Sequence, residues 1–205
     1  MAKRALEFSE VLDFQAHRIM QGQAAGLRDA AMAAICFYGV RRISEALTLP
    51  VENVTFETVA VKVHIAKQKN DPGRGVTCWI PRLPRLGPLC PHKLLHDWAA
   101  LRSSTLGGDV GPLFVVTGRS TCKPVSYDLF RKCVNAYFTE SDVGSHSFRK
   151  GGARWYTHAR GVNPDLVQAQ GGWLSASTMR AVYTQHTASE HRAAFLDGAD
   201  TVLLP

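Results

Sequence analysis

Apolar side chains recur at helical spacing through the first quarter of the chain. A period near 3.6 covers residues 8–20 and 25–38, and a shorter stretch runs from Arg42 to Pro50. The charge-free run 30–40 is too short to span a bilayer, so it predicts a buried helix.

The hydrophobic period then changes to two. Residues 54–65 alternate apolar with polar positions and are predicted to be strand. A polar segment with Asp-Pro-Gly follows, and Val76 to Ile80 read as the returning strand. These signals predict a β-hairpin with three cations at or near its tip: Lys67, Lys69 and Arg74.

Helical spacing returns after the hairpin. We expect helices over residues 91–103, over 124–138 with Pro124 in its first turn, and over 146–160 with Ser145 as N-cap. The chain is therefore predicted to be mainly α with one small antiparallel sheet.

The last quarter of the chain carries three further helical segments. Asn163-Pro164-Asp165 is a good start for a short helix ending at Gly171-Gly172. Ser175 or Ser177 starts the next, which runs through Tyr183, and a last helix covers about 188–196.

Positive charge is unevenly placed along the chain. The 205 residues hold 24 Lys+Arg and 17 Asp+Glu, a formal charge of +7. Residues 51–150 hold 14 Lys/Arg and 8 Asp/Glu, so +6 of that charge falls there. A basic middle favours a polyanionic partner.

The cysteine pattern indicates reduced thiols. The five cysteines are odd in number and form no Cys-x-x-Cys pair, which is typical of a cytoplasmic or nuclear protein. A zinc site could be imagined from Cys78, Cys90, His92 and His96, but their spacing matches no standard module. No metal or cofactor is therefore expected, nor is a signal peptide, since the first ten residues lack an apolar core.

Three local patterns offer candidate chemistry. Arg42 and Glu45 lie three residues apart on one helix face, a spacing that alone usually gives a surface ion pair. His146 and Arg149 share another face near a helix start, where cationic side chains and the helix dipole favour an anion. Gly171-Gly172-Trp173 is followed by Tyr183, ten residues after the tryptophan. Taken alone, each of these two aromatic residues would be predicted to lie in the hydrophobic core.

Taken in order, these patterns resemble the catalytic domain of the tyrosine recombinase (phage integrase) family, in its Cre-like form with tryptophan after the double glycine. The resemblance covers roughly residues 25–197. It implies a mainly α fold with a small antiparallel three-stranded sheet. The family positions are filled by Arg42, Lys69, His146, Arg149, Trp173 and Tyr183, with Glu45 in support.

The resemblance also implies the chemistry. In this family a tyrosine hydroxyl, here Tyr183, attacks a DNA phosphodiester and leaves a 3′-phosphotyrosine and a free 5′-hydroxyl. Arginines suit the negative charge of that transition state, so Arg42 and Arg149 would clamp the phosphate. His146 would add a donor or take the tyrosine proton. The indole N–H of Trp173 would reach the phosphate.

Two assignments have alternatives on the chain. Lys69 would protonate the leaving 5′-oxygen, but Lys67 lies two residues earlier on the same strand face. Arg-x-x-Glu spacing selects Arg42 over Arg41. The other tyrosines lie in apolar helical patterns and are predicted to be core: Tyr38, Tyr127, Tyr137 and Tyr156.

Domain organisation and partners follow from the same resemblance. Residues 1–24 would be an N-terminal helix or remnant of a linker, and 25–205 a catalytic domain with a C-terminal helix. The N-terminal core-binding domain of full-length relatives would be absent. The expected partners are double-stranded DNA and further copies of the chain, as a tetrameric synapse on DNA with a monomer as the option in isolation; no membrane is expected.

Competing functions are a type IB topoisomerase-like relaxation of supercoils by a monomer, and a DNA-binding domain without catalysis. The complete residue set argues against the second.

Overall fold

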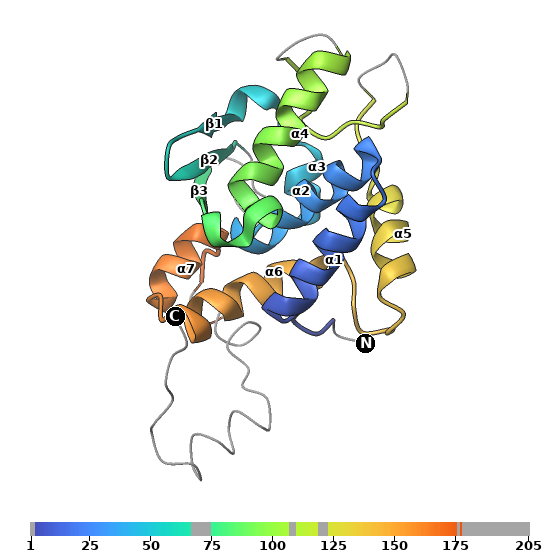
Figure 1. Ribbon diagram of the computed structural model, residues 1–205. Coiled ribbons are helices and arrows are strands. Elements are labelled where there is room, and N and C mark those ends of the chain that lie inside the picture. Colours follow the sequence, from blue (N-terminus) through green and yellow to red (C-terminus); the bar gives the residue numbers. More distant parts are fainter. Residues whose placement is uncertain (1–2, 67–74, 107–109, 119–122, 176, 178–205) are drawn as a thin grey trace.

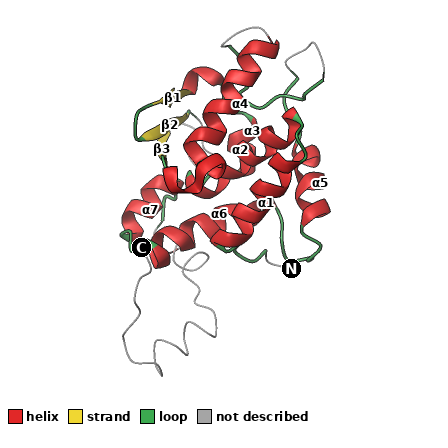
Figure 2. Cartoon of the chain, in the orientation of Figure 1, coloured by secondary structure: helices red, strands yellow, loops and turns green. Residues whose placement is uncertain are grey.

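A computed structural model describes residues 3–66, 75–106, 110–118, 123–175 and 177. Helices dominate the chain, and one small sheet lies to one side of them (Figure 2). Within the described ranges no helix is long and apolar enough to cross a membrane.

Helix α2 (Ala24–Tyr38) is the centre of the fold (Figure 1). Every residue from Ala30 to Tyr38 is buried, as expected for a helix that is apolar on all sides. The predicted buried helix is thereby confirmed. Helix α1 (Phe8–Met20) packs on α2 and adds Val11 and Phe14 to the same core.

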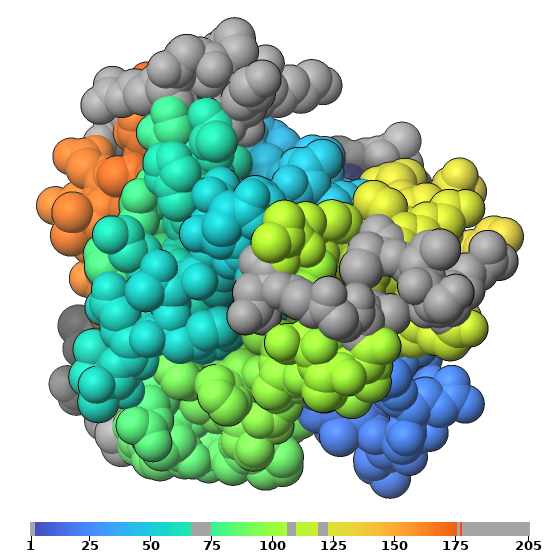
Figure 3. Space-filling view, turned by 90° about the horizontal axis from the view of Figure 1, so that it is seen from above, coloured from blue at the N-terminus to red at the C-terminus, as the bar shows by residue number. Residues whose placement is uncertain are grey.

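The sheet has the order β1-β2-β3 and is antiparallel throughout. The register pairs Val54 with Val63 and Val63 with Cys78. Its inward face joins the core through alternate residues of β2 and β3: Val61, Val63, Ile65, Cys78 and Ile80. From above, the sheet region covers one side of the molecule and residues 130–140 the opposite side (Figure 3).

The apolar–polar alternation predicted one strand over 54–65, and the structure divides it into two. Strand β1 is Val54–Phe56 and β2 is Ala60–Ile65, while β3 is Val76–Pro81. A turn separates β1 from β2, closed by the Glu57 N–H donating to the Ala60 carbonyl at 2.9 Å. Val59 is 72% exposed in that turn. The hairpin tip with Lys67, Lys69 and Arg74 lies outside the described residues.

Two predicted helix starts are wrong by one to three residues. Helix α5 is Tyr127–Tyr137, and the Ser126 hydroxyl caps it by accepting the Leu129 N–H. Pro124 lies before it, in a β-bridge with Val115. Helix α6 is Ser145–Arg154; its N-cap is Gly144, whose N–H donates to the Ser147 hydroxyl at 3.1 Å.

The remaining elements complete the framework. Helix α3 is Ile43–Leu47, α4 is Pro91–Leu106 and α7 is Pro164–Gly171, which begins after Asn163 as predicted. Short 3₁₀ turns cover Val51–Asn53 and Pro84–Leu89, and a π turn covers Trp155–Ala159 after α6. The helices predicted from Ser175 or Ser177 onward lie outside the described residues, apart from Ser175 and Ser177 themselves.

Helix α6 approaches α2 and the N-terminal segment through two glycines. A Cβ on Gly152 would lie 1.9 Å from the Phe37 carbonyl oxygen, and one on Gly151 would lie 2.2 Å from the Leu6 carbonyl oxygen. Both neighbours are backbone, so α6 could not keep its position with a larger residue at either place.

We expect Gly152→Ala to lower the free energy of unfolding by about 3 kcal/mol, because the added methyl overpacks the α2–α6 contact. Urea unfolding with an unchanged m value measures this loss. Gly144→Ala is the matched control: its Cβ meets only the flexible Lys3 side chain, at 3.2 Å from Cε. A loss under about 1 kcal/mol is expected there. Equal losses in both variants would contradict the close-approach explanation.

Candidate active site

A sharp change of direction at the end of α2 places the first pair of candidate residues. Val40 has φ +53°, the one positive φ of a non-glycine residue in the described part of the chain. This backbone conformation costs a β-branched residue about 1–3 kcal/mol, so contacts with the surrounding residues must stabilise it. Val40 is fully buried against Ala153, Val167 and Trp173. The turn therefore links the start of α3 to the other parts of the site.

The carboxylate of Glu45 is the meeting point of the site. It is 6% exposed, so this is not the surface ion pair that the spacing alone suggests. Its Oε2 accepts the Arg42 backbone N–H at 2.9 Å and its Oε1 pairs with Arg42 Nη1 at 3.0 Å. Arg41 Nε lies 3.2 Å from Oε2, and Arg149 Nη1 lies 3.7 Å from the same oxygen.

Helix α6 brings Arg149, one of the second pair of candidate residues, to this carboxylate. Arg149 is fully buried, and its Nη2 donates to the Gly171 carbonyl at 3.2 Å. Its guanidinium carbon lies 4.2 Å from the centre of the Trp173 ring, a stacking cation–π contact. Residues far apart in sequence thus converge: Arg42, Glu45, Arg149 and Trp173.

The Gly-Gly-Trp sequence has a steric reason. Gly172 ends α7 with φ +70°, a left-handed conformation that favours glycine. A Cβ on Gly171 would lie 2.0 Å from the Trp173 ring, so only glycine lets the indole fold back against the chain. Gln168 fixes the turn, since its side chain donates to the Trp173 carbonyl at 2.9 Å.

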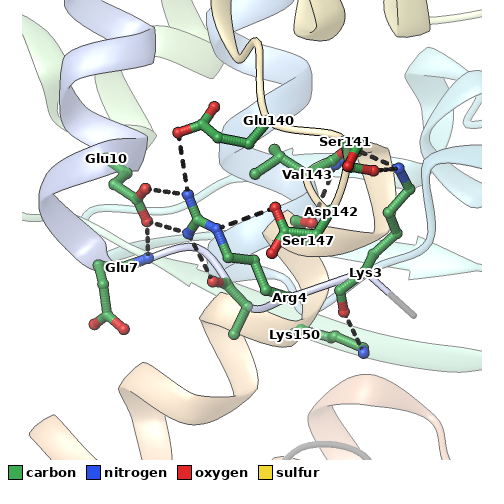
Figure 4. A network of polar contacts seen from close by, with 12 residues as sticks. Lys3, Arg4, Glu7, Glu10, Glu140, Ser141, Asp142, Val143, Ser147 and Lys150 are labelled. Atoms are coloured by element: carbon green, nitrogen blue, oxygen red, sulfur yellow. Dashed lines mark hydrogen bonds and ion pairs between the residues drawn. The ribbon is translucent and has the colours of Figure 1, made fainter. Parts of the chain in front are cut away.

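The N-terminal segment holds α6 from outside (Figure 4). Lys3 Nζ donates to the carbonyls of Ser141 and Val143, and the Lys3 carbonyl accepts from Lys150 Nζ. Arg4 forms two hydrogen bonds with the Glu10 carboxylate, at 2.8 and 2.6 Å. The Lys3 contacts tie the chain before α1 to residues 141–143, which precede α6, and to Lys150 on α6.

The sheet is attached to the same site through its edge strand. On β3, the Trp79 N–H donates to Gln170 Oε1 at 3.1 Å, and Gln170 Nε2 donates to the Trp79 carbonyl at 2.6 Å. Gln170 also donates to the Tyr38 carbonyl at 3.1 Å. Helix α7 therefore joins β3, the end of α2 and the Gly-Gly-Trp turn.

The electrostatics of the site favour an anion. Three guanidinium groups share the Glu45 carboxylate, so this group of four side chains carries a net charge of +2. Two of the arginines, Arg41 and Arg149, are fully buried. Buried charge without a counter-ion is costly, and an oxyanion would offset it.

His146 is neutral in this environment. The ring is half-buried, and burial together with the charges of Arg149, Lys150 and Arg42 lowers its pKa to about 4. The sequence suggested an ordinary imidazole near 6.5. The difference in pKa comes first from burial of the ring and then from the cationic neighbours, both of which disfavour the charged form.

The thiols and other tyrosines near the site are poor nucleophiles. Burial raises the pKa of Cys36 to about 12 and that of Cys78 to about 11. Burial also raises the pKa of Tyr38 and Tyr156 above the ordinary value, and the Tyr156 hydroxyl donates to the Tyr38 carbonyl at 3.0 Å. Tyr127 is 48% exposed, so its prediction as core is wrong; its side chain lies on the exposed face of α5's first turn.

Two of the predicted site positions, the general acid and the nucleophile, fall outside the residues that the structure describes. Lys69, its alternative Lys67, and Tyr183 lie outside the described residues. Among the described residues, no group of three or more His, Cys, Asp or Glu is placed to hold a metal ion. Sequence reasoning missed Arg41 and the Gly171 carbonyl, because Arg-x-x-Glu spacing points to one arginine only.

The sequence matches the model of the phage integrase family over residues 6–190, and the chain belongs to that family. A comparison with curated proteins finds no match.

Solved tyrosine recombinases have the same fold. XerH recombinase is 19% identical, with a TM-score of 0.69 over 95% of this chain and 53% of that chain. XerA recombinase is 17% identical, with a TM-score of 0.69 over 96% of this chain and 65% of that one. The Tn1549 transposon integrase is 16% identical, with a TM-score of 0.63 and coverages of 95% and 65%. The predicted fold class is confirmed, and this chain spans 53–65% of these relatives.

The lowered pKa of His146 has a consequence for stability. As pH falls, the unfolded chain takes up this proton near 6.5 and the folded chain only near 4, so stability is lost across that window. We expect His146→Gln to reduce the loss between pH 7 and pH 4.5 by about 1–2 kcal/mol, less than the full shift because the ring is partly exposed. Urea unfolding at both pH values measures it.

The control for this prediction is His64→Gln, on the exposed face of β2. It should leave the pH dependence of the wild type nearly unchanged. The same flattening in both variants would show that the effect does not arise at His146.

Proposed function

We propose that this chain is the catalytic domain of a DNA breaking and rejoining enzyme, a site-specific recombinase or integrase, such as that of a mobile element. The observation that carries the proposal is the net charge of +2 around Glu45, built from two arginine positions of the family and one further arginine. A scissile phosphodiester supplies the anion that this site lacks. The enzyme acts where DNA is, in the reducing cytoplasm or nucleus.

The reaction uses these residues in distinct roles. The Tyr183 oxygen attacks phosphorus, its proton passes to His146, and the bond from phosphorus to the 5′-oxygen breaks. Arg42 and Arg149 bind the non-bridging oxygens, and the Trp173 indole N–H adds a donor. Lys69 gives a proton to the leaving 5′-oxygen, with Lys67 as the alternative.

Rejoining reverses these steps. A 5′-hydroxyl attacks the 3′-phosphotyrosine bond and displaces the tyrosine, which recovers its proton. Because the covalent intermediate keeps the energy of the phosphodiester, the sequence of steps balances without ATP, and the arginines supply the positive charge. Neither cofactor nor metal enters the scheme.

The fold relatives support DNA as the partner. The XerH structure is a complex with a palindromic difH substrate after cleavage, and the Tn1549 integrase is bound to transposon right end DNA. The lambda integrase structure is a dimer on a core site. We extend both properties to this chain, as binding of double-stranded DNA and assembly of several copies on it.

The nucleophile assignment is tested with nicked suicide DNA, from which a short 5′-hydroxyl fragment leaves irreversibly. The wild type should form an adduct that persists in SDS gels, and Tyr183→Phe should form none, a loss of at least about 10³-fold. Tyr137→Phe is the matched control, since that tyrosine ends α5 and packs against Phe14 and His17 of α1. An adduct with Tyr183→Phe would refute the assignment, and the absence of an adduct with Tyr137→Phe would show that loss of the adduct is not specific to Tyr183.

Assembly on DNA is tested separately. We expect deletion of residues 187–205, which include the predicted helix 188–196, to lower the mass of the complex on DNA, because that helix would dock on a neighbouring copy. Light scattering with and without DNA measures it. Unchanged mass would contradict the exchange, and supercoil relaxation by a monomer without exchange of strands between duplexes would favour topoisomerase-like activity instead.

A further inference from the structure

A second arginine lies behind the predicted phosphate ligands. Arg41 directly precedes Arg42, but its side chain is 0% exposed, whereas that of Arg42 is 22% exposed. Its guanidinium lies beside the Cys78 thiol and donates to the Gly171 carbonyl. The Arg149 side chain is equally buried, so what distinguishes Arg41 is the set of partners that it binds.

Arg41 shares both of its oxygen partners with Arg149. Its Nε lies 3.2 Å from Glu45 Oε2, which also lies 3.7 Å from Arg149 Nη1. Its Nη2 donates to the Gly171 carbonyl, which also accepts from Arg149 Nη2 at 3.2 Å. Each acceptor that Arg41 engages therefore gives less of its charge to Arg149.

This arrangement is costly for folding. Arginine stays charged in proteins, and Arg41 Nη1 has no hydrogen-bond acceptor in the described part of the chain. An apolar side chain of similar volume would fill the same space without burying a charge, and such replacements are often neutral or stabilising. The charge at this position thus calls for an explanation other than stability.

We propose that Arg41 is a positioning residue that links Glu45 to the Gly171 carbonyl, and so sets Arg149 and Trp173 for the phosphate. The link acts on both sides of the site: Glu45 holds Arg42, and Gly171 is two residues from Trp173. Its charge also raises the positive potential felt by an incoming phosphate. This inference rests on the proposed function.

The variants Arg41→Met and Arg41→Lys separate shape from charge. Methionine keeps the volume and removes the charge, while lysine keeps the charge but cannot bridge both acceptors in one plane. Arg28→Met is the matched control, because Arg28 is also buried and ion-paired, at 2.8 Å from Asp29. Asp29 keeps a second partner in that variant, Arg18 at 2.7 Å.

The first readout compares cleavage with binding. We expect Arg41→Met to slow single-turnover adduct formation by about 10–100-fold, since small misplacements of clamping groups cost that much. Arg41→Lys should be intermediate and Arg28→Met within about threefold of wild type. DNA affinity should change less than about threefold, and the slope of log affinity against log salt should not change.

The second readout does not depend on cleavage. The indole N–H resonance of Trp173, assigned by its loss in Trp173→Phe, should shift in Arg41→Met and stay in place in Arg28→Met. The Trp98 indole, which donates to the Leu113 carbonyl at 3.0 Å, is the internal reference.

The outcomes separate this inference from the proposed function. A salt slope lower by about one would show that Arg41 contacts a phosphate itself and would overturn the positioning role. An unmoved Trp173 resonance with wild-type cleavage would overturn it as well. If the wild type forms no adduct, the proposed function fails, while the Trp173 resonance still decides whether Arg41 sets the indole.

Discussion

One buried carboxylate, that of Glu45, organises the centre of this molecule. Three guanidinium groups reach it from two elements, and two of those groups are shut off from water. In a medium of low dielectric constant neither the carboxylate nor the arginines are stable alone. Helix α3, which carries Glu45, and helix α6, which carries Arg149, must therefore stay close, and the tight packing of the surrounding chain keeps them so.

Small residues and one strained residue make the approach possible. Gly151 and Gly152 let α6 lie against backbone carbonyls, and Gly171 lets the Trp173 ring fold onto the chain. Val40 adopts a left-handed conformation where the chain must redirect from α2 into α3. Such strain persists only where surrounding contacts over-determine the conformation, and Val40 is enclosed by residues from three other segments. Packing and electrostatics thus constrain the same few positions.

Much of this could be predicted from the sequence, for identifiable reasons. The core helix α2 follows from an unbroken apolar run, and α7 from Asn-Pro-Asp at its start and Gly-Gly at its end. The turn between β1 and β2 was missed, although the alternation moves from even to odd positions between Phe56 and Val59. The role of Arg41 could not be found, because its partners come from distant segments, and the lowered pKa of His146 could not, because it depends chiefly on burial in the folded chain. A local pattern contains the residues of a site but not their shared partners.

The lowered pKa of His146 and the positive charge around Glu45 have part of their cause in common. Burial of the ring is the largest cause of the lowered pKa, and the charges of Arg149, Lys150 and Arg42, which also attract an oxyanion, add to it. A bound phosphodiester would partly cancel the field of Arg42 and Arg149 and so remove the part of the lowering that these charges cause. The imidazole would then become a better acceptor for the tyrosine proton when the phosphate is in place. Substrate binding would thus prepare the base, and without DNA the same ring would stay a weak one.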